Sequence, residues 1–185
     1  MKTAKLYSAN FKGVSTASAI IKHQTDSEFS HTAVWMDEQA KTYIKSLIGE
    51  DEYEKRMIED KCLIEQWPHS GNFWDAWFDY NDYTGHTPGT EVEIWSLELP
   101  VHEWKYCIQH YANSIGERYD WTGIAHFRFR SVKHNPHRSF CSEKFIQPLI
   151  QVKDWGNIRP WNIHPGLAVG VLEIAGGKLE DCRVI

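Results

Sequence analysis

The sequence SFCSEKF at residues 139–145 joins a cysteine to the pattern of a helix start, and it decides how the fold is interpreted. Ser139 is a candidate N-cap, because its hydroxyl can accept a hydrogen bond from a backbone N–H of the first turn. Glu143 falls in that turn, where the helix dipole favours a carboxylate. Apolar residues then recur on one side of the predicted helix: Phe145, Ile146 and Leu149. Pro148 lies inside this pattern, so we expect the helix to stop near Gln147 or to kink there.

This helix start gives Cys141 a setting that the other three cysteines lack. A thiol attacks only as the thiolate, and an unperturbed pKa of about 8.5 leaves little thiolate at neutral pH. The N–H groups and the dipole at a helix N-terminus lower that pKa. Cys107 instead falls in the middle of a predicted helix, Cys62 opens a predicted strand, and Cys182 lies in the C-terminal tail. No CxxC pair is present, and a chain of this size without an export signal is expected to keep its thiols free.

Periodicity elsewhere in the chain alternates between strand and helix, which predicts an α+β fold. The predicted strands are residues 17–22, 29–36, 62–67, 91–99 and 169–174. The predicted helices are one or two surface helices in the charged segment 37–61, broken near Gly49, and one helix over 104–115 that stops at Gly116. Residues 72–90 are rich in aromatic side chains without a clear period, so we expect a loop there. No repeat or linker divides the chain, which predicts a single domain over 1–185 with a helical insert at about 37–61.

Two further stretches carry polar side chains at element ends. The sequence FSHTAVW at residues 29–35 places His31 in a predicted strand, and GERYDW at residues 116–121 places Tyr119 directly after a predicted helix. An imidazole beside a thiol can take its proton and so activate it as a nucleophile. His31 is therefore a candidate base for Cys141.

In their order along the chain, the three stretches resemble the YiiX/YebB-like proteins. Ser-His before apolar residues on a strand is followed by Gly-x-x-Tyr-Asp after a helix, and then by aromatic-Cys-Ser-Glu at a helix start. These proteins are circularly permuted relatives of the NlpC-type cell-wall hydrolases of bacteria and phages, and are related to lecithin:retinol acyltransferase. In the permuted relatives the His strand precedes the Cys helix, as His31 precedes Cys141 here. The resemblance spans about residues 30–146 and implies a circularly permuted papain-like (NlpC-type) fold, in which a small antiparallel sheet or barrel packs on helices.

The resemblance also implies a role for each of four residues. Cys141 would be the nucleophile, His31 the general base, and Glu65 the carboxylate that orients the imidazole. Glu65 matches the family pattern of a Glu in an apolar strand before a Pro turn, since it lies between Ile64 and Pro68. The hydroxyl of Tyr119 would help to bind an oxyanion.

A Cys-His-Glu site of this kind implies a thiol-dependent hydrolase that works through a thioester intermediate. The relatives cleave amide bonds in peptidoglycan-type peptides or transfer and remove acyl chains. We therefore expect a cysteine peptidase, amidase or acyltransferase-like enzyme without a cofactor or a metal. Its substrate would be a small molecule, a peptide or an acyl chain, and the aromatic segment 73–83 could cover the substrate groove.

Composition excludes two classes of partner. The net charge is −5 and no run of Lys or Arg is present, so we expect no nucleic-acid partner. No apolar stretch approaches the roughly twenty residues of a membrane span. The N-terminal sequence MKTAKL has no apolar run behind its positive charges, which argues against a secretory signal and favours a cytoplasmic protein. Delivery by a phage or a secretion apparatus is an open alternative.

Two other readings of the sequence stay open. His126, His134 and His137 form the spacing H-x₇-H-x₂-H near Cys141, and zinc takes His and Cys ligands. That spacing matches no common zinc module, and basic residues surround it. Alternatively, the chain is a catalytically inactive binding module that keeps a papain-like groove. In that case no thiol would show unusual reactivity toward an alkylating reagent.

Overall fold

The computed structural model describes residues 2–56, 61–67, 71–76, 86–115, 117–120 and 139–185. Within these residues the strands are β1 (Thr3–Lys12), β2 (His31–Trp35), β3 (Lys61–Trp67), β4 (Gly71–Ala76), β5 (Glu91–Pro100) and β6 (Lys178–Val184). The α-helices are α1 (Thr16–Thr25), α2 (Glu38–Ile48), α3 (Glu50–Arg56), α4 (Val101–Asn113), α6 (Cys141–Val152) and α7 (Pro165–Ile174). A short 3₁₀ helix spans Pro160–Asn162. The chain is thus α+β, as the sequence predicts.

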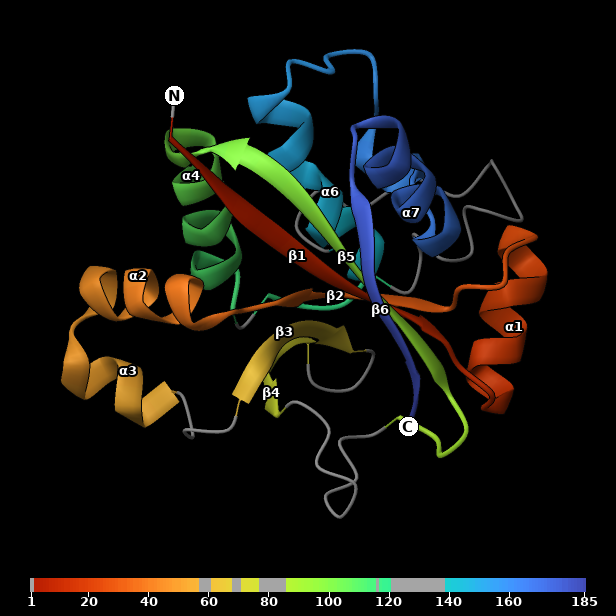
Figure 1. Cartoon of the computed structure of the whole chain (residues 1–185). Helices are drawn as coiled ribbons and strands as arrows, with labels where there is room; N and C mark the ends of the chain where they lie inside the picture. Colours follow the sequence, from red (N-terminus) through yellow and green to blue (C-terminus); the bar gives the residue numbers. More distant parts are fainter. Residues whose placement is uncertain (1, 57–60, 68–70, 77–85, 116, 121–138) are drawn as a thin grey trace.

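The strands form one open antiparallel sheet in the order β4-β3-β2-β1-β5-β6. Figure 1 shows β1 and β5 side by side through the middle of the molecule, with β6 along the other side of β5. The central strand β1 was not predicted. It pairs with β2 over residues 7–11 and with β5 over residues 3–12, so it joins the two halves of the sheet.

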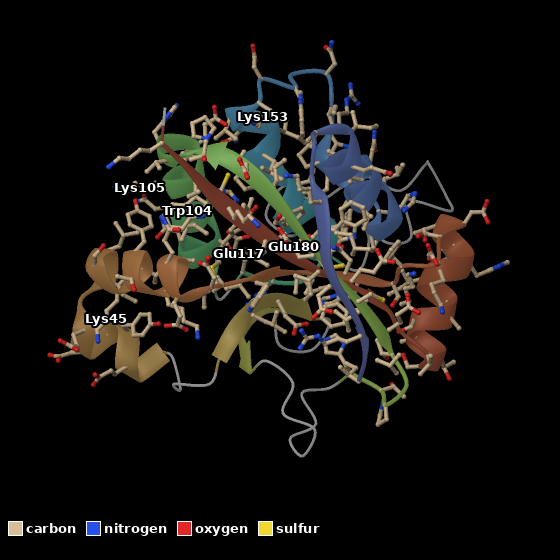
Figure 2. All side chains as sticks on the ribbon, in the orientation of Figure 1. Lys45, Trp104, Lys105, Glu117, Lys153 and Glu180 are labelled. Carbon is tan, nitrogen blue, oxygen red and sulfur yellow. The ribbon has the colours of Figure 1, made fainter. Side chains whose placement is uncertain are left out.

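Helices cover one face of the sheet and form the main core with it. Apolar residues of β1, β2 and β5 point to this face, among them Leu6, Val34 and Leu99. The helical side is supplied by α2, α4, α6 and α7, through residues such as Trp104, Ile108, Phe145, Leu149 and Leu172. Figure 1 shows α6 and α7 next to each other, and α4 near the N-terminal end of β1. At the far end of α6, Lys153 forms an ion pair of 3.0 Å with Glu103 of α4 (Figure 2).

The opposite face carries a second, smaller core. It contains Ala9, Phe11, Ala33, Leu63, Val92 and Ile94. Side chains alternate between faces along a strand, so the β1 residues Ala9 and Phe11 belong to this face while Ala4 and Leu6 belong to the other. This smaller core underlies the candidate site.

Two predicted strands are helices in the structure. Residues 17–22 lie in α1, where the side chain of Ser15 caps the helix by accepting a hydrogen bond from Ser18 N–H at 3.1 Å. Residues 169–174 lie in α7, which starts with Pro165 at a position where a missing N–H costs nothing. Short apolar runs are consistent with either element, and in both cases the capping residues before the run decide for a helix.

The C-terminal residues were expected to form a tail and instead form β6. This strand pairs with β5, and Cys182 lies opposite Glu93. The expected loop over 72–90 is also corrected in part, because residues 71–76 form β4, which pairs with β3. Residues 77–85, and with them most of the aromatic segment 73–83, lie outside the described residues.

The start of α6 differs from the prediction, and of the two outcomes expected at Pro148 the structure excludes the stop. The helix begins at Cys141 with Phe140 as the N-cap residue, so Ser139 is not the cap. Glu143 instead accepts a hydrogen bond from Phe140 N–H at 3.4 Å. The helix also runs past Gln147 and through Pro148 to Val152. Burial of Phe145, Leu149 and their neighbours in the main core outweighs the one backbone hydrogen bond that a proline removes.

The remaining expectations for the helices are confirmed. The segment 37–61 contains α2 and α3, which are separated at Gly49, whose φ of 85° favours glycine. Asp37 caps α2 by accepting a hydrogen bond from Ala40 N–H at 2.8 Å. The predicted helix over 104–115 is α4, which ends earlier, at Asn113, and the part of the expected apolar stripe that lies within it is buried. No helix among the described residues is long and apolar enough to cross a bilayer.

Candidate active site

Cys141 is the first residue of α6 and is buried at the point where α6 meets β2. Its sulfur accepts hydrogen bonds from the backbone N–H groups of Thr32 and Ser142, and its side chain is hydrogen-bonded to His31. Burial favours the neutral thiol, but the charge and the hydrogen bond of His31 act against it. Together with the two N–H groups, they hold the pKa of the Cys141 thiol below its ordinary value. Among Cys107, Cys141 and Cys182, Cys141 is therefore the thiol whose surroundings favour a thiolate, since the pKa values of the other two are raised.

His31 connects Cys141 to Glu65. Nε2 of His31 lies 2.7 Å from Oε2 of Glu65, which leaves Nδ1 as the ring nitrogen for Cys141. A carboxylate only accepts, so Nε2 carries the proton and Nδ1 faces the thiol as the acceptor. This is the tautomer that a general base needs.

The pairing of β2 with β3 explains why these two side chains meet. Val34 pairs with Ile64, and both residues belong to the main core on the helical face. His31 and Glu65 each lie an odd number of residues away from that pair, so both side chains stand on the opposite face. A shift of one residue in this register would separate them.

Charge in the site is shared between the thiol and the imidazole. Burial opposes the imidazolium, but the Cys141 thiolate and the hydrogen bonds to Cys141 and Glu65 raise the pKa of His31 to about 10. The lowered pKa of the thiol and the raised pKa of the imidazole each favour the charged form of the group. Both favour a thiolate–imidazolium pair at neutral pH.

His86 completes the group and was not singled out from the sequence. It lies shortly before β5, and its Nε2 is 3.1 Å from the same Oε2 of Glu65 that His31 contacts. Its ring stacks on Phe11 with centroids 4.0 Å apart and planes 4° from parallel. Nothing in the neighbouring sequence marks His86 as part of a site, because its partners lie on β1, β2 and β3.

Glu65 is a buried carboxylate between these two imidazoles. None of its side chain is exposed, which by itself would favour the protonated acid. The charges and hydrogen bonds of His86 and His31 overcome this effect and hold the pKa of Glu65 below its ordinary value. Glu65 is thus an ionised partner for His31.

Tyr119, the fourth predicted site residue, lies beside the start of α6. The segment containing it pairs with the residues just before Cys141, through a parallel bridge between Tyr119 and Ser139 and a hydrogen bond of 2.8 Å from Asp120 N–H to the Ser139 carbonyl. The ring is buried. Burial, followed by the charges of Cys141 and Asp120, raises the pKa of Tyr119 well above its ordinary value. The phenol is therefore a neutral group within electrostatic reach of the thiol.

A layer of ionisable residues underlies the first turn of α6. Asp120, Glu143 and Lys144 are buried there, and Lys144 forms an ion pair with Glu117. Burial and the charge of Asp120 raise the pKa of Glu143 to about 8, against the hydrogen bond from Phe140 N–H that lowers it. Glu143 is thus held as a neutral acid over much of the neutral range.

The site also contains a set of potential metal ligands. His31, Glu65 and His86 place three ligand atoms within 4.8 Å of one another. Zinc bonds of about 2.0–2.2 Å would hold neighbouring ligand atoms about 3.3 Å apart. The contacts of 2.7 and 3.1 Å are shorter, as hydrogen bonds require. The alternative zinc ligands His126, His134 and His137 lie outside the described residues.

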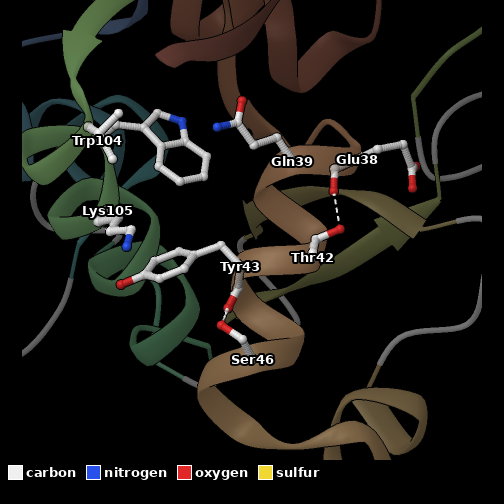
Figure 3. A pocket seen from close by; sticks show the side chains of 8 residues that line it. Glu38, Gln39, Thr42, Tyr43, Ser46, Trp104 and Lys105 are labelled. Carbon is white, nitrogen blue, oxygen red and sulfur yellow. Dashed lines mark hydrogen bonds between the residues drawn. The ribbon is translucent and has the colours of Figure 1, made fainter. Parts of the chain in front are cut away.

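A surface groove between α2 and α4 is separate from this site. Figure 3 shows Tyr43 of α2 facing Trp104 and Lys105 of α4. The Lys105 ammonium lies 5.2 Å from the centre of the Tyr43 ring. None of the four predicted site residues lines this groove.

Neither a scan against protein-family models nor a search of curated proteins found a match for this chain. The geometry of Cys141, His31, Glu65 and His86 and the order of the sequence motifs therefore indicate what chemistry the site can support.

Proposed function

We propose that the chain is a cysteine hydrolase or acyltransferase with a permuted papain-like fold, in which Cys141 is the nucleophile. The observation that carries this proposal is the hydrogen-bonded series from the Cys141 thiol through His31 to the buried carboxylate of Glu65. A helix start, an imidazole in the correct tautomer and an ionised orienting carboxylate are what nucleophilic catalysis by a thiol needs.

The proposed reaction begins with the thiolate–imidazolium pair. The Cys141 sulfur attacks an amide or ester carbonyl, forming a C–S bond as the carbonyl π electrons move to the oxygen. N–H groups at the start of α6 lack partners within the helix, and with the Tyr119 hydroxyl they stabilise this oxyanion. As the tetrahedral intermediate collapses, the bond to the leaving amine or alcohol breaks and His31 gives that group its proton. The product is a thioester on Cys141.

The second half returns the enzyme to its starting state. His31, now neutral, takes a proton from water or another acceptor, whose oxygen or nitrogen attacks the thioester carbonyl. Collapse releases the acid or the new acyl product and regenerates the thiolate beside the imidazolium. Glu65 holds the imidazole in one tautomer and stabilises its charge without taking the proton.

The substrate class that this chemistry supports is an amide or acyl carbonyl. The resemblance to NlpC-type hydrolases favours peptidoglycan-type peptides, and the resemblance to lecithin:retinol acyltransferase favours acyl chains. The acidic net charge favours neither a nucleic acid nor another polyanion.

Thiol reactivity tests the proposal directly, with Cys182 as an internal control because its side chain is exposed. Purified protein would be treated with iodoacetamide at pH 6, and alkylation at each cysteine followed by peptide mass spectrometry. We expect Cys141 to react faster than Cys182 despite its burial, and His31→Ala to abolish this advantage. A panel of peptide amides and acyl esters, screened with wild type and Cys141→Ala, would then identify the substrate through the thioester mass on Cys141. Equal, slow alkylation of Cys141 and Cys182 would instead indicate an inactive binding module.

A further inference from the structure

We propose that His86 is a positioning residue that fixes the Glu65 carboxylate, so that the site is a series of four side chains: Cys141, His31, Glu65 and His86. This inference rests on the proposed function, since it concerns how the same site is held in its working geometry. It assigns a role to a residue that no motif in the sequence indicates.

The first observation is that two imidazoles converge on one oxygen. Oε2 of Glu65 lies 2.7 Å from Nε2 of His31 and 3.1 Å from Nε2 of His86. The other oxygen, Oε1, lies 3.4 Å from Nε2 of His86. The carboxylate only accepts, so His86 donates from Nε2. The orientation of the carboxylate toward His31 is therefore fixed from two sides.

The second observation is that His86 is itself held rigidly. Only 6% of its side chain is exposed, and its ring lies flat on Phe11. Phe11 pairs with His31 across β1 and β2, and its ring is 5.3 Å from the His31 ring. Phe11 thus contacts both imidazoles, which fixes the relation between the His31 and His86 rings.

Because Glu65 is buried, loss of the hydrogen bond from His86 should change the position or the charge of its carboxylate. No part of the Glu65 side chain is exposed, so water cannot freely replace a lost partner. A buried carboxylate that loses a donor either moves toward another one or takes up a proton. Either change weakens the hold on His31, and through His31 it reduces the thiolate fraction of Cys141.

Two substitutions of His86 distinguish a role in positioning Glu65 from a role in packing alone. His86→Phe keeps a flat ring that can stack on Phe11 but removes the donor. His86→Gln keeps a side-chain N–H donor but loses the ring. Iodoacetamide alkylation of Cys141 at pH 6 and thermal unfolding would be measured for both full-length variants and wild type, with Cys182 as the internal reference.

We expect His86→Phe to slow alkylation of Cys141 by about 10-fold to 100-fold, by analogy with the loss of the partner that orients a metal-binding histidine. His86→Gln should restore most of that reactivity, even if its unfolding temperature is the lower of the two. The inference would be overturned if the alkylation rate of Cys141 correlated with the unfolding temperature of the variants and not with the presence of an N–H donor at position 86.

A measurement on the wild-type protein keeps the inference testable if His86→Phe does not fold. Nuclear magnetic resonance of ¹⁵N-histidine-labelled protein should show Nε2–H protons of both His31 and His86, protected from exchange and shifted downfield by the carboxylate. An Nδ1–H tautomer of His86 would rule out donation to Glu65. If both Nε2–H protons are present while Cys141 is unreactive in wild type, the proposed function fails instead.

Discussion

Oε2 of Glu65 lies 2.7 Å from Nε2 of His31, although the two residues are 34 positions apart in the chain. The helical insert of α2 and α3 lies between them and does not disturb the pairing of β2 with β3. Because the contact depends on strand register, the insert can be long without moving either side chain. The site is therefore built into the sheet, with Cys141 brought to it by α6.

The pH dependence of turnover should be bell-shaped. The pKa of Cys141 is lowered, so the thiolate is present above that pKa and is lost as the pH falls through it. The pKa of His31 is raised to about 10, so the imidazolium that protonates the leaving group is present below about pH 10 and lost above it. We expect kcat/KM to be high across the neutral range and to fall at both ends. A single rise near pH 9, as for an ordinary thiol, would contradict the ion pair.

Glu65→Gln should reduce turnover by roughly 10²–10⁴, by analogy with loss of the orienting carboxylate of a triad. The neutral amide no longer stabilises the imidazolium, so the pKa of His31 should fall and the alkaline limb of the pH profile should move to lower pH. Steady-state kinetics with a circular dichroism spectrum for each variant would check both effects. Full activity in a folded Glu65→Gln would mean that another group orients His31.

Tyr119→Phe tests the predicted oxyanion role with little change in volume. If the hydroxyl stabilises the oxyanion, kcat should fall by about 10²–10³ while KM changes little. The rate of Cys141 alkylation should be unaffected, because alkylation forms no oxyanion. Equal kcat in Tyr119→Phe and wild type would reduce Tyr119 to a packing residue beside Ser139.

Glu143→Gln should stabilise the protein at alkaline pH. The pKa of Glu143 is raised from its ordinary value to about 8, so between about pH 4.5 and 8 the folded protein holds a proton that the unfolded chain has released. The contribution of Glu143 to stability therefore decreases as the pH rises through this window. Gln is neutral at every pH and can still accept from Phe140 N–H.

Urea unfolding at pH 5, 7 and 8.5 measures this effect. The advantage of Glu143→Gln over wild type should be smallest at pH 5, at about 1 kcal/mol or less, and exceed about 2 kcal/mol at pH 8.5. Glu173→Gln is a suitable control, because Glu173 is an exposed helix residue of α7. A constant difference across the three pH values would show that Glu143 ionises as an ordinary carboxylate.

The sequence by itself determined the α+β class, the helical insert, the helix α4 and the strands β2, β3 and β5. These elements are marked by local signals: alternating apolar residues, a helical stripe, or a break such as Gly49. It also indicated Cys141, His31 and Glu65, through a helix start and the order of short motifs. Where signals were weak, as in residues 17–22 and 169–174, apolar runs fitted both elements and the prediction was wrong.

Tertiary structure alone decided the rest. The central strand β1 and the edge strand β6 are defined by their partners, and sheet pairing between distant segments has no local signature. The same reason explains His86: its position depends on stacking against Phe11 and on the buried oxygen of Glu65, which come from other strands. Burial also set the charges of the site, because a pKa depends on solvent exposure and on neighbours that only the folded chain brings together.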